Sequence, residues 1–410
     1  MNINIPASIL DLKGQCVNEI NCNEAINTIT IVCHRDRRFR PTDSHKQLGT
    51  INRYVRRTIS DLPLLSHRVQ IEIELIQMLT KDNKRHMESC DFVDKGCYYT
   101  RRFCCVVSGL CRYMTISAVA KHFDLRWETV KNMDKQYLQN TLPALNPAEL
   151  VNLKYLGVDE VARAKGHDYM TVVYDLGTGK LIWVHEGRKA EIFSAFLKQL
   201  TDATKQGILA VAMDMGPAYQ KAVHDDLPNA DIIFDRFHVM QNYSQAIDNQ
   251  RRAEFRRADR PGKDLIRGSR FLLLKNADKL SEKQHDKLKI LLQENENINL
   301  LYMLKEQLQS LWSHRTYDEM ANALENWCQM AHQTDMVYIK NFTKLLHRHK
   351  EGICNYAKHP LTTARIEAGN VAIGLIRKRA RGIRDTEYFK LKIRQLSEPH
   401  KEPLFYKKPI

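Results

Sequence analysis

Five short apolar segments after Pro147 constrain the fold of this chain more than any other feature. They occupy residues 153–159, 169–175, 180–186, 208–213 and 230–234. Most are rich in β-branched or aromatic residues, which favour β-strands. The second and third are separated by Leu-Gly-Thr-Gly, a connection typical of a β-hairpin. Helices are predicted at about 190–203 and from Pro217 onward, so the elements follow the order β-β-β-α-β-α-β.

This order is that of an RNase H-like core, in which three antiparallel strands are extended by parallel strands through right-handed crossovers. The strand signal then disappears from residue 237 to about 357, where Lys, Gln, Glu and Leu dominate at helical spacing. Residues 362–380 predict a helix that Thr362 or Thr363 can cap. The predicted fold is therefore α/β: an RNase H-like catalytic core interrupted by an all-helical insertion.

Two aspartates stand at the ends of predicted strands. Asp159 ends the first strand and Asp214 follows the fourth, and these two strands are neighbours in an RNase H-like sheet. Adjacent carboxylates repel unless a cation lies between them, and hard oxygen ligands select Mg²⁺ or Mn²⁺. Glu367, in the early turns of the last predicted helix, is well placed as a third acid. Together the three acids predict a site where two ions stabilise the attacking and leaving oxygens of an in-line phosphoryl transfer.

A helix-turn-helix pattern precedes the predicted sheet. Residues 116–123 carry apolar side chains at i, i+3, i+4 and i+7, the spacing of one helical face. Asp124 follows in a tight-turn position, where Asp tolerates a positive φ, and a second amphipathic helix continues to about residue 138. In this motif the second helix presents its early residues to base edges. The candidate DNA-reading residues are Arg126, Glu128, Thr129, Lys131 and Asn132.

The net charge also favours a polyanionic partner. The chain has 63 Lys and Arg against 48 Asp and Glu, which gives +15. Basic residues cluster at 35–57, 251–275 and 377–394. A single charge run is usually a solvated face, but three in one basic chain predict a long nucleic-acid-binding track. The candidate DNA contacts outside the helix-turn-helix are Arg251, Arg252, Arg256, Arg257, Arg377, Lys378 and Arg379.

The cysteines and the apolar runs exclude several other classes of protein. No apolar run approaches the roughly 18 residues of a membrane helix, and the first 22 residues lack the apolar core of a signal peptide. Without an export signal, a disulfide framework is not expected. Eight of the ten cysteines lie at or before Cys111, but no C-x-x-C pair occurs. We therefore expect reduced core thiols and no structural zinc beyond weak binding.

Five motifs resemble the bacterial insertion-sequence transposases with a D-D-E site, of the ISL3 type. They are GVDE at 157–160, AMDMGPAY at 212–219, DRFHVM at 235–240, RIEAGN at 365–370 and IRKRARGIRD at 376–385. The resemblance extends from about residue 110 to 396. It implies that Asp159, Asp214 and Glu367 are the metal-binding catalytic acids. Asp235 and His238 match a further family signature, for which orienting, packing and DNA-contacting roles all stay open.

Two departures from the family pattern are visible. Family members typically begin with a zinc ribbon of paired C-x-x-C knuckles. Here the ribbon is either degenerate and metal-free or uses an irregular ligand set that includes His34 or His45. Relatives also tend to have Asn-Gly before the third acid, where this chain has Arg365 and Ile366. If Glu367 is not the third acid, Glu160 and Asp235 are the next candidates.

The resemblance implies a cut-and-paste DNA transposase that binds the terminal inverted repeats of an insertion sequence and catalyses metal-dependent strand cleavage and strand transfer. Its implied partner is double-stranded DNA, at the element ends and at the target. It would act as a homodimer or higher oligomer on DNA, in the bacterial cytoplasm at the nucleoid. The alternatives are a structure-selective nuclease with the same core and a DNA-binding regulator derived from a transposase.

Five domains are predicted along the chain. They are a basic, Cys-containing, degenerate zinc-ribbon-like region (1–108), the helix-turn-helix (109–150), the first part of the core (151–240), the helical insertion (241–357), and the core completion with the third acid and a basic tail (358–410).

Overall fold

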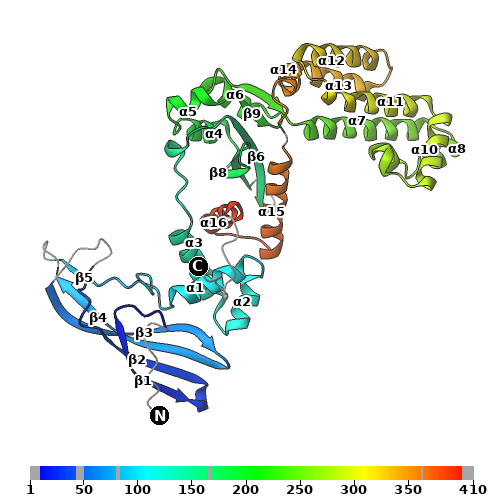
Figure 1. Ribbon diagram of the computed structural model, residues 1–410. Helices are drawn as coiled ribbons and strands as arrows, with labels where there is room; N and C mark the ends of the chain where they lie inside the picture. Colours follow the sequence, from blue (N-terminus) through cyan, green and yellow to red (C-terminus); the bar gives the residue numbers. More distant parts are fainter. Residues whose placement is uncertain (1–9, 43–49, 80–83, 165–167, 362, 399–410) are drawn as a thin grey trace. The chain divides into compact units, whose positions relative to one another are not determined.

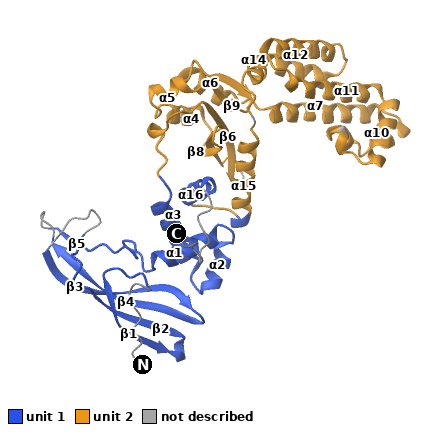
Figure 2. Cartoon of the chain, in the orientation of Figure 1, with its two compact units in different colours: residues 1–143, 379–381, 387–410 blue, residues 144–378, 382–386 orange. Residues whose placement is uncertain are grey.

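The chain divides into two compact units, which Figure 2 shows in different colours. The computed structural model describes residues 10–42, 50–79, 84–164, 168–361 and 363–398 (Figure 1). Unit 1 comprises residues 1–143, 379–381 and 387–410, and unit 2 comprises residues 144–378 and 382–386. The helix-turn-helix motif therefore lies in unit 1, and the three predicted catalytic acids all lie in unit 2.

Unit 1 begins with a five-stranded β-sheet, in a region for which the sequence predicted only a zinc-ribbon-like remnant. Its strands are β1 (Gln15–Asn23), β2 (Thr28–Arg35), β3 (Thr50–Leu64), β4 (His67–Leu79) and β5 (Arg85–Met87). The order is β1-β2-β4-β3, with β5 paired to β4, and only the β2–β4 pair is parallel. Alternate residues of β4, from Val69 to Leu75, are buried, so one face of the sheet forms the core.

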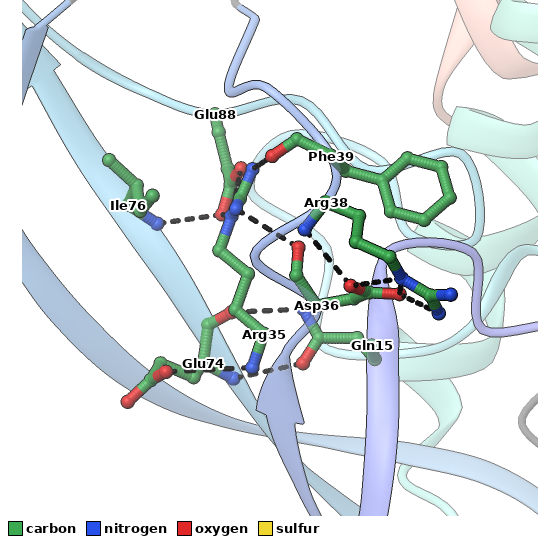
Figure 3. A network of polar contacts seen from close by, with 8 residues as sticks. All are labelled: Gln15, Arg35, Asp36, Arg38, Phe39, Glu74, Ile76 and Glu88. Carbon is green, nitrogen blue, oxygen red and sulfur yellow. Dashed lines mark hydrogen bonds and ion pairs between the residues drawn. The ribbon is translucent and has the colours of Figure 1, made fainter.

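A buried ion pair closes this sheet (Figure 3). Arg35, at the end of β2, donates from Nε to both carboxylate oxygens of Glu88, at 3.0 and 2.9 Å. Its Nη2 donates to the carbonyl of Phe39 at 2.6 Å, and Glu88 accepts the Ile76 N–H at 2.7 Å. A buried charge is tolerated only when it is paired and hydrogen-bonded. The contacts therefore join the ends of β2 and β4 and the segment after β5.

Three helices follow the sheet and confirm the predicted motif. They are α1 (Arg101–Cys111), α2 (Ile116–Phe123) and α3 (Trp127–Thr141). Asp124 separates α2 from α3 with a φ of 51°, the left-handed conformation predicted for it. Val119 and Val130 are fully buried and share one hydrophobic core with Ile59 and Ile71 of the sheet. The apolar face of the sheet thus packs against the apolar side of the helix-turn-helix.

Unit 1 also contains the last helix, α16 (Thr386–Ser397). Asp134 of α3 is fully buried, and its carboxylate accepts hydrogen bonds from Ser108, Tyr388 and Lys392 at 2.5, 2.5 and 3.0 Å. Two of these donors come from α16, so that helix packs with α1 and α3. Residues 358–410, predicted as one core-completing segment, are therefore divided between the two units.

Unit 2 is built on a second five-stranded sheet, and the predicted strands are confirmed. They are β6 (Tyr155–Ala164), β7 (Asp168–Asp175), β8 (Lys180–Glu186), β9 (Ala210–Met213) and β10 (Asp231–Phe234), in the order β10-β9-β6-β7-β8. The β6–β7 and β7–β8 pairs are antiparallel, and β9 is parallel to both β6 and β10. The predicted hairpin turn is closed by the Gly179 N–H, which donates to Asp175 O at 2.7 Å.

Three short helices connect these strands. They are α4 (Ala190–Leu197), α5 (Asp202–Gly207) and α6 (Pro217–Asp226). The single helix predicted at 190–203 is wrong, because Thr201 caps a second helix by accepting the Thr204 N–H at 3.2 Å. Helix α6 begins at Pro217, as predicted. Phe193, Phe196 and Tyr219 from these helices are fully buried in the core of unit 2.

From Arg236 to Ala357 every element that the structure describes is a helix, as predicted (Figure 1). The α-helices are α7 (Arg236–Arg257), α8 (Arg260–Ile266), α9 (Arg270–Leu274), α10 (Glu282–Glu294), α11 (Glu296–Ser310), α12 (Tyr317–His332), α13 (Val337–Arg348) and α14 (Lys350–Cys354). Buried rings of Tyr243, Trp327 and Phe342 contact one another in the middle of this bundle. Helix α15 (Ala364–Ala380) follows, just after the predicted cap Thr363, whereas Thr362 lies outside the described residues.

Candidate active site

The register of β6 and β9 places the two predicted catalytic aspartates side by side. The strands are parallel, and Gly157 lies opposite Ala212. Asp159 and Asp214 each follow two residues later, so they lie at the same level and on the same side. The prediction that Asp159 ends the first strand is wrong, because β6 continues to Ala164 through its pairing with β7 and Asp159 lies in its middle. Asp214 comes directly after β9, as predicted, and its Oδ1 accepts the Gly216 N–H at 2.9 Å. The predicted proximity of the two carboxylates is confirmed.

Helix α15 packs directly on this part of the sheet. A Cβ added to Gly157 would overlap the Cδ1 of Ile366 and lie 2.8 Å from a side-chain carbon of Leu176. The absence of a side chain at Gly157 therefore allows the helix to approach the strand closely. Arg365 fixes the start of the helix by donating from Nη1 to the carbonyls of Leu176 and Gly177, at 3.2 and 3.0 Å. This packing brings the helix of the third predicted acid onto the strand of the first.

One pocket of about 290 Å³ contains all three predicted acids in its lining. Asp159, Asp214 and Glu367 line it together with Asp235 and His238. Within the described ranges, however, no three His, Cys, Asp or Glu side chains are close enough to hold a metal ion between them. The three acids thus share a pocket without converging on one point.

Asp159 is the acid whose ionisation the surroundings disturb most clearly. Burial raises the pKa of Asp159 above its ordinary value, and the neighbouring Asp214 raises it further. Three groups act in the opposite direction. The Glu160 N–H donates to its Oδ1 at 2.7 Å, Asn370 Nδ2 donates to its Oδ2 at 2.5 Å, and His238 lies nearby. The charge of Asp159 is therefore costly in the protein alone, as expected for a carboxylate at a functional site.

The two alternative third acids are placed differently. Burial and the nearby Asp214 raise the pKa of Glu160, and its Oε2 lies 3.8 Å from Arg188, but Glu160 does not line the pocket. Asp235 does line it. Its Oδ1 caps α7 by accepting the Phe237 N–H at 2.9 Å, and its Oδ2 lies 4.0 Å from Nε2 of His238. The second family signature is therefore at the pocket, and Asp235 has a helix-capping role there.

The candidate DNA-reading residues lie at the beginning of α3. Arg126 is its N-cap residue and is exposed, as are Glu128 and Asn132, whereas Thr129 and Lys131 are half-buried. The sequence interpretation missed Trp127, which is 48% exposed in the first turn. Its ring centroid lies 6.0 Å from the ammonium nitrogen of Lys131, one helical turn further on. The spacing of the two residues could have identified this pair, because side chains at i and i+4 are neighbours on the surface of a helix.

The basic residues of α7 do not form one uniform surface. Asp248 is only 1% exposed, and its carboxylate is surrounded by Arg251 at 2.8 Å, Arg252 at 2.9 Å and Arg270 at 3.7 Å. The Arg251 side chain is itself only 14% exposed. The expected DNA contact of Arg251 therefore does not fit its position, because its guanidinium neutralises a buried carboxylate.

Two basic residues of the third run also contact the protein itself. Arg377 Nη1 donates to the carbonyl of Ala162 at 2.6 Å, and Arg379 Nη1 donates to the carbonyl of Arg112 at 2.5 Å. These guanidinium groups hold backbone in place and are only half-exposed. The exposed members of the predicted set outside the helix-turn-helix are Arg252, Arg256, Arg257 and Lys378.

All ten cysteines are free thiols. The Sγ atoms of Cys97 and Cys104 lie 3.8 Å apart in the core of unit 1. The hydrogen bond from Cys104 lowers the pKa of Cys97 to about 6, although burial acts in the opposite direction. Of the two proposed histidine ligands, His34 is exposed and His45 lies outside the described residues. The expectation that this region binds zinc no more than weakly stays a prediction.

Comparisons with known proteins agree with the resemblance found in the sequence. Residues 156–393, more than half of the chain, match an ISL3 family model described as a transposase. Residues 88–138 match the helix-turn-helix domain of transposase family ISL3. No helix among the described residues is long and apolar enough to cross a membrane.

Two curated relatives are transposases. The chain is 34% identical over 342 residues to the transposase for insertion sequence element IS1001 of Bordetella parapertussis. The aligned residues make up 82% of this chain and 84% of the relative. It is 26% identical over 294 residues to the transposase for insertion sequence element IS1557 of Mycobacterium tuberculosis, and these residues make up 66% of each chain. The predicted family is confirmed, and this chain belongs to the ISL3 family of transposases.

Proposed function

We propose that this transposase cleaves DNA at the ends of an insertion sequence and joins the ends to target DNA by in-line phosphoryl transfer. Asp159, Asp214 and Glu367 are its catalytic acids. The observation that carries the proposal is their presence in the lining of one pocket, although they come from three distant segments of the chain. A β-strand, the residue after a second strand and the first turn of a helix supply them.

The core of unit 2 is proposed to be RNase H-like. The strand order β10-β9-β6-β7-β8, with three antiparallel strands extended by two parallel ones, supports this assignment. The bundle from α7 to α14 would then be an insertion after the fifth strand, and α15 would return to the sheet with the third acid. The predicted domain boundaries at 108, 150, 240 and 357 stay part of this proposal.

The acids fit a divalent cation of the hard type. Asp159 is a half-buried carboxylate beside Asp214, and burial, followed by the charge of Asp214, raises its pKa, so a cation between the two acids would favour its ionised form. Asp159, Asp214 and Glu367 would together hold two divalent ions, either Mg²⁺ or Mn²⁺. When bound, the ions supply the positive charge that stabilises the transferring phosphate. The protein's own contribution is to hold Asp159 in place through the hydrogen bonds of Glu160 and Asn370.

The partner is proposed to be double-stranded DNA, both at the element ends and at the target. Because the curated relatives are transposases for insertion sequence elements, this chain would recognise the terminal repeats of its own element. The early residues of α3, namely Arg126, Thr129, Lys131 and Asn132, would make the sequence-reading contacts. A homodimer or higher oligomer would hold the two ends together.

A cleavage and joining assay tests the proposal. The substrates are labelled duplexes taken from the chromosomal flanks of the gene, incubated with full-length protein, a target plasmid and Mg²⁺ or Mn²⁺. Wild type should nick the duplex and join it to the plasmid. Asp159→Asn, Asp214→Asn and Glu367→Gln each remove one charge with little change of shape. Each should lose at least about 10²-fold in cleavage and retain DNA binding.

Glu160→Gln is the matched control, because Glu160 adjoins Asp159 but does not line the pocket. Its cleavage should stay close to wild type. Full activity of Glu367→Gln together with loss in Glu160→Gln would overturn the assignment of the third acid. Cleavage without joining would indicate a structure-selective nuclease, and binding without cleavage would indicate a regulator.

A further inference from the structure

Asn370 makes a polar contact in the pocket that the three acids do not account for. It lies one helical turn after Glu367 in α15 and lines the same pocket. Its Nδ2 donates to Oδ2 of Asp159 at 2.5 Å, across 211 residues of sequence. Its Oδ1 is buried, and no hydrogen-bond donor contacts this oxygen among the residues that the structure describes. The N–H group of the Asn370 side chain thus has a hydrogen-bond partner, whereas its carbonyl oxygen has none among the described residues.

The chemistry of the two groups fixes this orientation. An ionised carboxylate can only accept hydrogen bonds, so the amide must turn its N–H toward Asp159. The amide oxygen must then face elsewhere. A buried acceptor without a donor costs free energy, and most such groups in native proteins are satisfied by something. Amide oxygens, like carboxylates, are hard ligands that suit divalent cations.

We propose that Asn370 both positions Asp159 and is itself a further ligand of the divalent cation of this site. Its N–H holds the Asp159 carboxylate in one orientation, and its Oδ1 would supply the ion with a neutral oxygen. This inference rests on the proposed function, because it takes Asp159 to be a metal ligand. Residues that orient metal ligands typically change metal affinity by about 10- to 100-fold when they are removed.

The alternative is that Asn370 merely ties α15 to the sheet. Two arginines of the same helix make such ties without touching an acid. Arg365 donates to the carbonyls of Leu176 and Gly177, and Arg377 donates to the carbonyl of Ala162. Arg377→Gln therefore removes a tether of α15 that lies ten residues after Glu367 (377 − 367), and it leaves the contact between Asn370 and Asp159 intact. It is the matched control for a purely structural role.

The first test measures binding of Mn²⁺ to full-length protein without DNA. Free Mn²⁺ is followed by electron paramagnetic resonance for wild type, Asn370→Ala and Arg377→Gln, and thermal unfolding of each variant is recorded. Asn370→Ala should bind Mn²⁺ about 10- to 100-fold more weakly than wild type. Arg377→Gln should bind within about twofold of wild type, even if it unfolds at a similarly lowered temperature. Unchanged binding by Asn370→Ala, or equal weakening in both variants, would overturn the proposal.

The second test separates affinity for the ion from the rate of cleavage. Cleavage by Asn370→Ala should need a higher Mn²⁺ concentration for half-maximal rate, and the maximal rate should recover at saturation. A maximal rate that stays low at saturating Mn²⁺ would contradict a positioning role. Asn370→Ser retains a hydroxyl donor, so it should lie between alanine and wild type. It replaces Asn370→Ala in both tests if the alanine variant does not fold.

Asp159→Asn separates a failure of this inference from a failure of the proposed function. If Asp159→Asn binds Mn²⁺ like wild type, Asp159 is not a metal ligand and the proposed function is wrong at that residue. If Asp159→Asn loses Mn²⁺ and Asn370→Ala does not, only the role of Asn370 is refuted.

Discussion

Ile366 packs on Gly157 so closely that a Cβ at position 157 would overlap its Cδ1. Gly157 lies two residues before Asp159 in β6, and Ile366 directly precedes Glu367 in α15. The contact therefore sets the distance between the strand of one predicted acid and the helix of another. The atoms that a Cβ would meet belong to the side chains of Ile366 and Leu176, which fill the space that glycine leaves on the strand.

Gly157→Ala should force the side chains of Ile366 and Leu176 to move, and with them the first turn of α15 next to Glu367. The added methyl group has no space, so we expect a loss of about 1–3 kcal/mol in the free energy of unfolding. Cleavage should fall even at temperatures where the variant is fully folded, because the Glu367 carboxylate moves relative to Asp159. Denaturant unfolding and the duplex cleavage assay measure the two effects.

Gly374→Ala is the control for that variant. Gly374 belongs to the same helix, and a Cβ added there would meet no atom within 4 Å. Replacing a glycine inside a helix by alanine in open space should stabilise the protein by about 0.5–1 kcal/mol and leave cleavage unchanged. Equal cleavage by Gly157→Ala and Gly374→Ala would show that the close approach is not needed.

Local features of unit 2 and of the helix-turn-helix could be predicted because short-range patterns determine them. The positive φ of Asp124 follows from an aspartate at the end of an amphipathic helix. The neighbouring positions of Asp159 and Asp214 follow from two parallel strands, β6 and β9, whose pairing was inferred from the order of elements along the chain. The turn is thus a local signal, and the strand pairing is a consequence of the topology.

Contacts between distant segments could not be predicted in the same way. The hydrogen bond between Asn370 and Asp159 depends on the packing of α15, which no periodicity reveals. The burial of Arg251 against Asp248 is similar, because a charge run does not show which guanidinium meets a buried carboxylate. The first part of β3 is exposed and gives no apolar alternation, whereas the regular alternation of apolar and polar residues from Val69 to Leu75 in β4 was a signal that could have identified the N-terminal sheet.

Asp159→Asn should raise stability at neutral pH. Burial, and then Asp214, holds the pKa of Asp159 above its ordinary value, so the folded protein favours the protonated form. The contribution of such a carboxyl is fully present below its unfolded-state pKa of about 3.9 and is lost as the pH rises through the raised value. The variant removes this penalty. Its melting temperature should exceed that of wild type at about pH 7.5 in EDTA, and the difference should vanish near about pH 3.5.

Asp225→Asn, at an exposed aspartate of α6, is the control for the effect of replacing a carboxylate by an amide. A lower melting temperature of Asp159→Asn at neutral pH would mean that the hydrogen bonds from Glu160 and Asn370 outweigh the electrostatic penalty.

Arg126→Ala combined with Lys131→Ala should weaken binding to element-end DNA far more than binding to random duplex. Contacts to base edges carry sequence information, whereas a phosphate contact alone would weaken both DNAs equally and flatten the salt dependence. Trp127→Ala should show the same selectivity, because Trp127 is exposed beside Lys131 in the first turn of α3. Fluorescence anisotropy at several salt concentrations measures both effects. Equal losses on the two DNAs would exclude α3 as the reading helix.

Purified protein should contain less than one equivalent of zinc. Among the described residues no three potential ligands converge, and burial raises the pKa of Cys90 to about 12, which disfavours the thiolate that zinc requires. Elemental analysis of protein prepared without added metal gives the zinc content. A stoichiometric signal that disappears in Cys90→Ser or Cys97→Ser would restore a zinc site of irregular spacing.

The arginines at the end of α7 should separate into a structural and a DNA-binding group. Arg251 neutralises Asp248, which is 1% exposed, so Arg251→Ala leaves a buried carboxylate with less compensation. Removing one partner of a buried pair typically costs about 3–5 kcal/mol, and the remaining contacts from Arg252 and Arg270 place this case toward the lower end. We therefore expect Arg251→Ala to lower the free energy of unfolding markedly, as measured by urea denaturation.

The double variant Arg256→Ala, Arg257→Ala should keep its stability and lose affinity for DNA, in contrast to Arg251→Ala. Both side chains are exposed at the end of α7, and neither has an ion pair to a described carboxylate that would be broken. Stability should change by less than about 0.5 kcal/mol, whereas binding to flanking duplex should weaken and the salt dependence should become shallower by about two phosphate contacts. The two variants are compared by urea denaturation and by anisotropy titrations between low and moderate salt. If Arg251→Ala keeps full stability but loses DNA binding, the ion pair with Asp248 is not what holds this residue, and the original expectation of a DNA contact is restored.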